Sequence, residues 1–143
     1  MANLAQLTEW TEHYLKNKDL MTRNIQSILK NESGWTLSVI RKDNTQHLLV
    51  IPHLENMTVL ISKLQPDLQA SLVVLNTRKN LDIVLQAWNE LIKFPKLSLI
   101  FANPESTTDK RWIIFPHTHE KITERKTLKL GLESLFLTVE AAN

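Results

Sequence analysis

Hydrophobic positions along the first half of the chain switch between helical and strand spacing. Within residues 4–29 they recur every three or four positions, which predicts an amphipathic helix with a break near residues 17–19. Residues 33–34, Ser-Gly, suit the left-handed conformation that ends many helices. Residues 35–41 and 46–52 are rich in β-branched and aliphatic side chains and are separated by a short polar turn, so they are predicted to form a β-hairpin.

The second half of the chain is predicted to form a strand, a helix and another strand. Residues 71–75 and 97–101 are short apolar runs, which are typical of strands buried on both faces. Between them, residues 81–92 carry a helical apolar stripe that includes Trp88, and Asn80 is the predicted N-cap. The whole pattern has the size of a βαβ unit, so the two strands are predicted to be parallel with a right-handed crossover.

Three further elements complete the predicted fold. Residues 54–64 show helical spacing, residues 111–116 form a fifth strand that most simply returns antiparallel, and residues 127–139 form a final amphipathic helix. The sequence therefore predicts one three-layer α/β domain over residues 1–143, with a mixed sheet of about five strands and helices packed on it. An α+β arrangement is the alternative.

In element order the chain is similar to the restriction-endonuclease-like core and to the small α/β fold of type III secretion chaperones. The first resemblance implies a Glu-x-Lys or Asp-x-Lys motif on the third strand, where it holds a divalent metal. Here that strand, residues 71–76, has no carboxylate, which disfavours an active nuclease. The secretion chaperones tend to be acidic, whereas this chain has 17 Lys and Arg residues against 15 Asp and Glu residues.

Composition excludes several chemistries. The chain has no cysteine, which removes disulfides, thiolate nucleophiles and Cys-ligated metals. Two glycines are too few for a Gly-rich phosphate loop, and no cofactor is predicted. The first residues do not resemble a signal peptide and no apolar run approaches the length of a membrane span, so a cytoplasmic protein without a membrane partner is expected. A formal charge of +2 is too small to indicate nucleic-acid binding by itself.

One candidate site is a metal site near the end of the predicted fifth strand. In an extended segment His117 and His119 would point to the same side, where both imidazoles could face one metal ion. His53 follows another strand and could add a ligand if the two strand ends are neighbours. The favoured interpretation is that these histidines are structural and bond the backbone.

The second candidate site lies at the carboxyl ends of the parallel strands, where open α/β sheets usually bind ligands. Four basic residues are expected to converge there near a helix N-terminus, which favours an anion. Together with polar residues at the strand ends, the candidate binding residues are Asn76, Thr77, Arg78, Lys79, Asn103, Lys110 and Arg111. Helix capping and solvation of the basic side chains explain these residues as well, and this is the favoured interpretation.

Because no spacing matches a catalytic template, the leading hypothesis is a non-enzymatic interaction module that binds a protein partner, with a second copy of the chain as one such partner. A nucleic-acid or phosphate-binding domain that uses the basic residues is the alternative. A metal-dependent hydrolase that uses the histidines is the third hypothesis.

Overall fold

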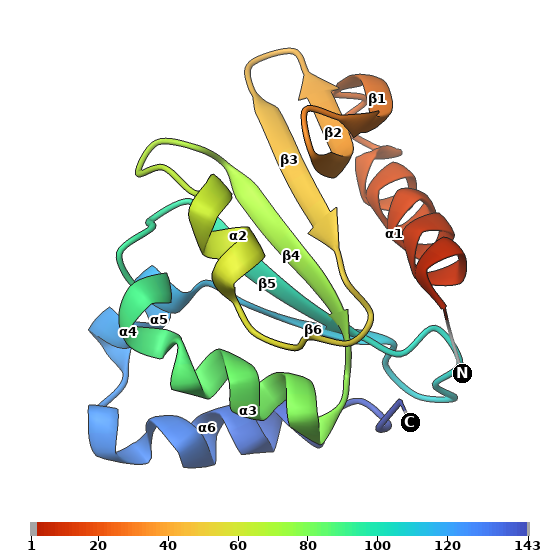
Figure 1. Ribbon diagram of the computed structural model, residues 1–143. Helices are drawn as coiled ribbons and strands as arrows, with labels where there is room; N and C mark the ends of the chain where they lie inside the picture. Colours follow the sequence, from red (N-terminus) through yellow and green to blue (C-terminus); the bar gives the residue numbers. More distant parts are fainter. Residues whose placement is uncertain (1–2, 143) are drawn as a thin grey trace.

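In the computed structural model, which describes residues 3–142, six strands form one mixed β-sheet (Figure 1). Their order across the sheet is their order along the chain: β1 (Ile25–Glu32), β2 (Trp35–Arg41), β3 (Thr45–Val50), β4 (Ala70–Leu75), β5 (Leu97–Ala102) and β6 (Arg111–Ile114). β1, β2 and β3 are antiparallel, β3, β4 and β5 run parallel, and β6 returns antiparallel to β5. The α/β class, the mixed sheet and the antiparallel return of β6 are therefore confirmed.

Seven helical segments connect or flank the strands of residues 3–142. They are α1 (Leu4–Asp19), α2 (Thr58–Lys63), α3 (Arg78–Gln86), α4 (Trp88–Leu91), α5 (Pro116–Ile122), the 3-10 turn η1 (Arg125–Thr127) and α6 (Leu128–Phe136). None of the helices described is long and apolar enough to cross a lipid bilayer.

The predicted strand–helix–strand unit is confirmed. β4 and β5 are parallel, and every residue of both strands is buried. The predicted N-cap is wrong, because Thr77 caps α3: its side-chain oxygen accepts the backbone N–H of Asn80 at 3.1 Å. The predicted single helix over residues 81–92 is divided at Ala87 into α3 and α4.

The predicted helix over residues 4–29 is wrong in its second half. α1 ends at Asp19, at the predicted break, and the chain then enters β1. Ile25 and Ile28 are three residues apart, which suits one face of a helix. The register shift between Ile25 and Ser27 lets both isoleucines pack on the same side of the sheet in a strand. Pairing with β2, which local spacing cannot reveal, therefore gives the sheet its sixth strand.

Ser33 and Gly34 form the turn between β1 and β2 and do not end a helix. Both have positive φ, 54° and 82°, as the two central residues of a tight hairpin turn of the mirror-image type require. The turn joins Glu32 to Trp35, which face each other in the β1–β2 pair. The left-handed conformation predicted here is correct, but it belongs to a hairpin.

The segment that contains the two histidines is helical, not extended. β6 ends at Ile114, and Pro116 begins α5. Proline suits the first position of a helix because its fixed φ matches helical geometry and its missing N–H would have had no partner there. The proposed extended geometry of His117 and His119 is therefore wrong.

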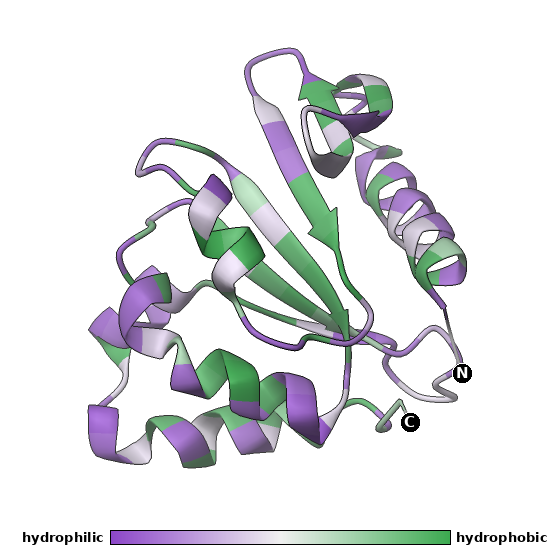
Figure 2. Cartoon of the chain, viewed as in Figure 1, coloured by the Kyte–Doolittle hydropathy of each residue, from purple (hydrophilic) through white to green (hydrophobic). Residues whose placement is uncertain are grey.

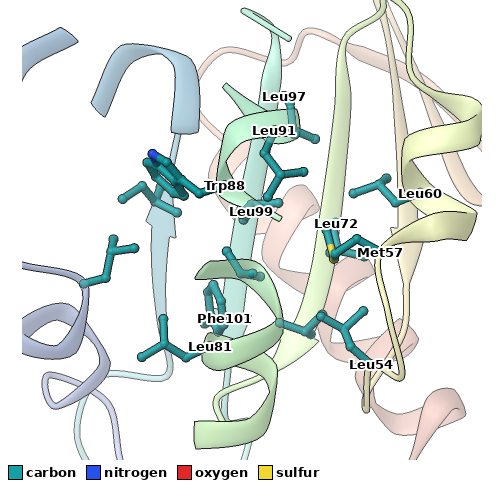
Figure 3. Close-up of a cluster of buried hydrophobic side chains, with 14 of the residues drawn as sticks. Leu54, Met57, Leu60, Leu72, Leu81, Trp88, Leu91, Leu97, Leu99 and Phe101 are labelled. Carbon is teal, nitrogen blue, oxygen red and sulfur yellow. The ribbon is translucent and has the colours of Figure 1, made fainter. Parts of the chain in front are cut away.

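The sheet separates two apolar clusters on its opposite faces. In β4, Leu72 and Val74 face the cluster beneath α2, α3, α4 and α6, whereas Val73 and Leu75 face α1. Figure 3 shows the larger cluster around Phe101, and in Figure 2 the central strands are the most continuously hydrophobic part of the chain. These two clusters and the sheet between them make the three predicted layers.

The two faces of the sheet are covered to different extents. Six strands about 4.8 Å apart span roughly 24 Å, whereas one α-helix with its side chains is about 10–12 Å wide. Four helices share the larger cluster, but α1 is the only helix among residues 3–142 that contributes to the other cluster (Figure 1). Part of the face beneath α1 is therefore left open, and the candidate site lies there.

Candidate functional site

A polar cleft of about 380 Å³ lies beside the C-terminal half of α1, at the end of the sheet where the parallel strands begin. In Figure 1 this is the upper end of β3, β4 and β5. The lining residues come from α1 and the turn after it, from β2, from the beginnings of the three parallel strands and the residues just before them, and from β6 and the residue after it. The volume is at the lower end of the range of about 300–1,000 Å³ typical of ligand pockets.

The floor of the cleft is a chain of hydrogen bonds that crosses three neighbouring strand pairs. Arg41 Nη1 on β2 donates to Gln46 Oε1 on β3 at 2.8 Å. Gln46 Nε2 donates to Ser71 Oγ on β4 at 2.7 Å, and Ser71 Oγ lies 2.6 Å from Ser98 Oγ on β5. Ser71 and Ser98 are 1% and 7% exposed. Because Arg41 can only donate, the amide of Gln46 is held in one orientation.

Positive charge dominates the lining of the cleft. Lys18, Arg41 and Lys96 line it together with one carboxylate, that of Asp19. Lys18 and Lys96 are exposed, and Arg41 is half-buried at one end of the floor. An anion in the cleft would therefore meet three cations and one fixed anion, and polar groups of the floor could bond it.

The Asp19 carboxylate is already used by the turn between α1 and β1. Its oxygens accept the backbone N–H groups of Ile25 and Asn24, each at 2.9 Å, and the Thr22 hydroxyl at 2.9 Å. The backbone bond from Ile25 is the largest cause that holds the pKa of Asp19 below its usual value, and the charge of Arg41 adds to it. Asp19 is therefore a structural anion that fixes the edge of the cleft.

At the opposite end of the sheet, Asn76 and Thr77 serve the fold. Asn76 is fully buried: its Nδ2 donates to the carbonyls of Phe136 and Val139 at 3.1 and 3.0 Å, and its Oδ1 accepts from Trp112 Nε1 at 2.8 Å. Thr77 caps α3, as described above. These contacts leave neither polar side chain aimed at a ligand.

The predicted convergence of basic residues does not occur. Arg78 pairs with Glu133 on α6 at 3.1 Å, whereas Arg111 lies over the ring of Tyr14 on α1, 4.9 Å from its centroid. The two guanidinium groups are thus held on opposite faces of the sheet, because α3 and α6 cover one face and α1 covers the other. Lys79 is exposed on α3.

Two other candidate binding residues at this end of the sheet donate hydrogen bonds to backbone carbonyls. Lys110 Nζ donates to the carbonyls of Pro104 and Ser106 at 3.0 and 2.8 Å. Asn103 Nδ2 donates to the carbonyl of Glu140 at 3.0 Å. The candidate binding residues of this end therefore do not form one pocket for an anion.

The three candidate histidines are not brought together. His53 follows β3, at the end of the sheet opposite to α5, which carries the other two. His117 Nδ1 lies 2.8 Å from the carbonyl of Ile92, and His119 packs edge-on against Trp88 with ring centroids 5.9 Å apart. Two residues apart on a helix, their side chains point about 200° away from each other. Within residues 3–142 there is no group of three or more metal-ligating side chains.

The sequence contained one signal for the cleft. Ser71 and Ser98 each interrupt an otherwise apolar strand at its second position, and β4 and β5 pair so that the two serines lie directly opposite each other. Alignment of Ala70, one residue before the predicted run 71–75, with Leu97 places the serines side by side. The contribution of Arg41 and Gln46 had no such signal, because it depends on the order of strands in the sheet.

Comparisons of the chain with protein-family models, with curated proteins and with solved structures found no match. The functional argument therefore rests on the residues and contacts of the cleft.

Proposed function

We propose that the protein is a non-enzymatic interaction module and that it binds an acidic segment of a protein partner at the cleft. The observation that supports this proposal is the excess of cations around a polar floor: Lys18, Arg41 and Lys96 against Asp19, whose oxygens already bond the turn. Acidic side chains of a partner would complement this charge, and complementary charge speeds association and selects partners.

The hydrogen bonds of the two serines in the floor support a role in ligand binding over a role in catalysis. A serine nucleophile needs a general base within hydrogen-bond reach. Ser71 and Ser98 bond Gln46 and each other, and no histidine of the described chain lines the cleft. The floor is thus suited to hold a polar group in place.

The test is a binding titration with acidic peptides at about 0.15 M salt, where charges more than about 8 Å apart are largely screened. Capped eight-residue peptides that alternate Glu with apolar residues are compared with peptides in which each Glu is Gln. We expect the acidic peptides to bind more tightly, and Lys18→Glu with Lys96→Glu to weaken binding at least tenfold.

The matched control is Lys121→Glu with Lys129→Glu, which makes the same change of charge at exposed lysines of α5 and α6. These two helices are not part of the cleft lining, so this variant should bind like the wild type. Equal binding of the Glu and Gln peptides, or equal losses in both double variants, would refute the proposal.

Nucleic-acid or phosphate binding is the second candidate function, because the same three cations would attract phosphate groups. The cations surround a small cleft and do not follow a track along the surface, so we expect short RNA or DNA to bind no more tightly than about 10⁻⁴ to 10⁻⁶ M at physiological salt. Nanomolar binding that Lys18→Glu with Lys96→Glu abolishes would favour this alternative.

A further inference from the structure

The two buried serine hydroxyls in the floor of the cleft carry two hydrogens, but the hydrogen bond between them needs only one. Ser71 and Ser98 each carry one hydroxyl hydrogen, and a single bond of 2.6 Å joins their oxygens. The only other partner of the pair within residues 3–142 is Gln46 Nε2, which donates and cannot accept. One hydroxyl hydrogen therefore remains for an acceptor in the cleft.

The hydrogen-bond chain favours one of the two hydroxyls as the one that offers that hydrogen. Arg41 donates to Gln46, and Gln46 in turn donates to Ser71. A hydroxyl that accepts a bond becomes a better donor, because hydrogen bonds in a chain polarise one another. Ser71 is therefore the better donor of the pair, and the remaining hydrogen belongs to Ser98. The positive charge of Arg41 acts through this chain on the Ser98 hydroxyl.

The surroundings of Ser98 combine a cation with an apolar wall. Lys96 lies just before the first residue of β5. Ile100, Ile113 and Phe115 line the same part of the cleft as Ser98. Phe115 is 50% exposed, so its ring offers accessible apolar surface at the cleft. A group that binds here would thus meet a donor, a positive charge and hydrophobic surface together.

We infer that the cleft recognises an acidic residue next to a hydrophobic residue in the partner. The Ser98 hydroxyl donates to the carboxylate, Lys96 provides the opposite charge, and the wall around Phe115 covers the neighbouring apolar side chain. This inference rests on the proposed function and specifies which pair of partner residues the cleft binds.

The test uses a capped six-residue peptide with one Glu-Phe pair, titrated by calorimetry against the full chain. Matched peptides carry Gln-Phe and Glu-Ala in place of that pair. We expect both changes to weaken binding, and Ser98→Ala to weaken binding of the Glu-Phe peptide about tenfold or more, because a hydrogen bond to a charged group is stronger than a neutral one. Ser98→Cys replaces the hydroxyl with a slightly larger thiol that is a weaker donor and should give a smaller loss.

Ser134→Ala, an exposed serine on α6, is the control and should bind like the wild type. If Ser98→Ala binds the peptide as the wild type does, while the double variant Lys18→Glu with Lys96→Glu loses binding, the role of the hydroxyl is overturned. The proposed function would then still stand. Equal binding of the Glu-Phe and Gln-Phe peptides would overturn recognition of a carboxylate. Failure of every acidic peptide to bind would refute the proposed function itself.

Discussion

Asn76 gives the sharpest test of the fold, because its side chain joins three separate parts of the chain. It follows β4, donates to one backbone carbonyl at the end of α6 and to one beyond it, and accepts from the indole of Trp112 on β6. Asn76→Ala removes all of these bonds at a fully buried position. If the residue were a ligand-binding group, the same substitution would affect binding and leave stability nearly unchanged.

The expected loss follows from the partners that would be left without a bond. A buried polar group without its partner costs about 1–3 kcal/mol. The Trp112 indole has a single N–H and so depends on Asn76 more than the carbonyls of Phe136 and Val139 do, since each carbonyl can accept a second bond. We therefore expect Asn76→Ala to lower the free energy of unfolding by about 3–5 kcal/mol, a large fraction of the 5–15 kcal/mol typical of a domain.

The measurement is urea unfolding followed by tryptophan fluorescence and circular dichroism, with Asn17→Ala as the control. Asn17 is exposed on α1, so its replacement should change stability by no more than about 0.5 kcal/mol. A loss below about 1 kcal/mol in Asn76→Ala would show that the bonds between β4, β6 and the end of α6 contribute little. The account of Asn76 as a structural residue would then be wrong.

Three further perturbations test other parts of the structure. Trp88 is 2% exposed, so Trp88→Ala should cost about 3–5 kcal/mol in urea unfolding; a loss under 1 kcal/mol would contradict its burial. Gly34 has φ +82°, so Gly34→Ala should cost about 1–2 kcal/mol, and equal or greater stability in a thermal melt would argue against the hairpin turn. Burial lowers the pKa of His47 and His119 below the ordinary 6.5, an effect that Glu120 partly opposes at His119. The unfolded chain then takes up protons first, so stability should be full above about pH 6.5 and fall as the pH drops to 5.5, and a rise over that interval would refute the burial of these imidazoles.

Local sequence patterns predicted most elements of the fold, and they failed where pairing with distant residues decided the structure. The buried runs of β4 and β5 were identified because strands covered on both faces are apolar throughout. The spacing of Ile25 and Ile28 suited a helix, and pairing with β2 through a bulge made this segment a strand. Pro116 was assigned to the end of a strand although it begins α5.

The candidate site was sought at the wrong end of the sheet for a physical reason. The rule that ligands bind at the carboxyl ends of parallel strands led to Arg78 and Arg111, which the structure holds on opposite faces in contacts with α6 and α1. The cleft lies at the other end, where α1 is too narrow to cover the sheet. No local pattern gives the width of a sheet relative to the helices that cover it.

The sequence by itself determined the α/β class, the parallel β4–β5 pair and the absence of cysteine and glycine-loop chemistry, because these follow from composition and from periodicity over a few residues. Only the tertiary structure decided that Arg41, Gln46, Ser71 and Ser98 form one hydrogen-bond chain. These residues are far apart in the sequence, and their contact depends on strand order, register and the face to which each side chain points. Such properties arise from pairing between distant segments, so they exist only once the sheet is assembled.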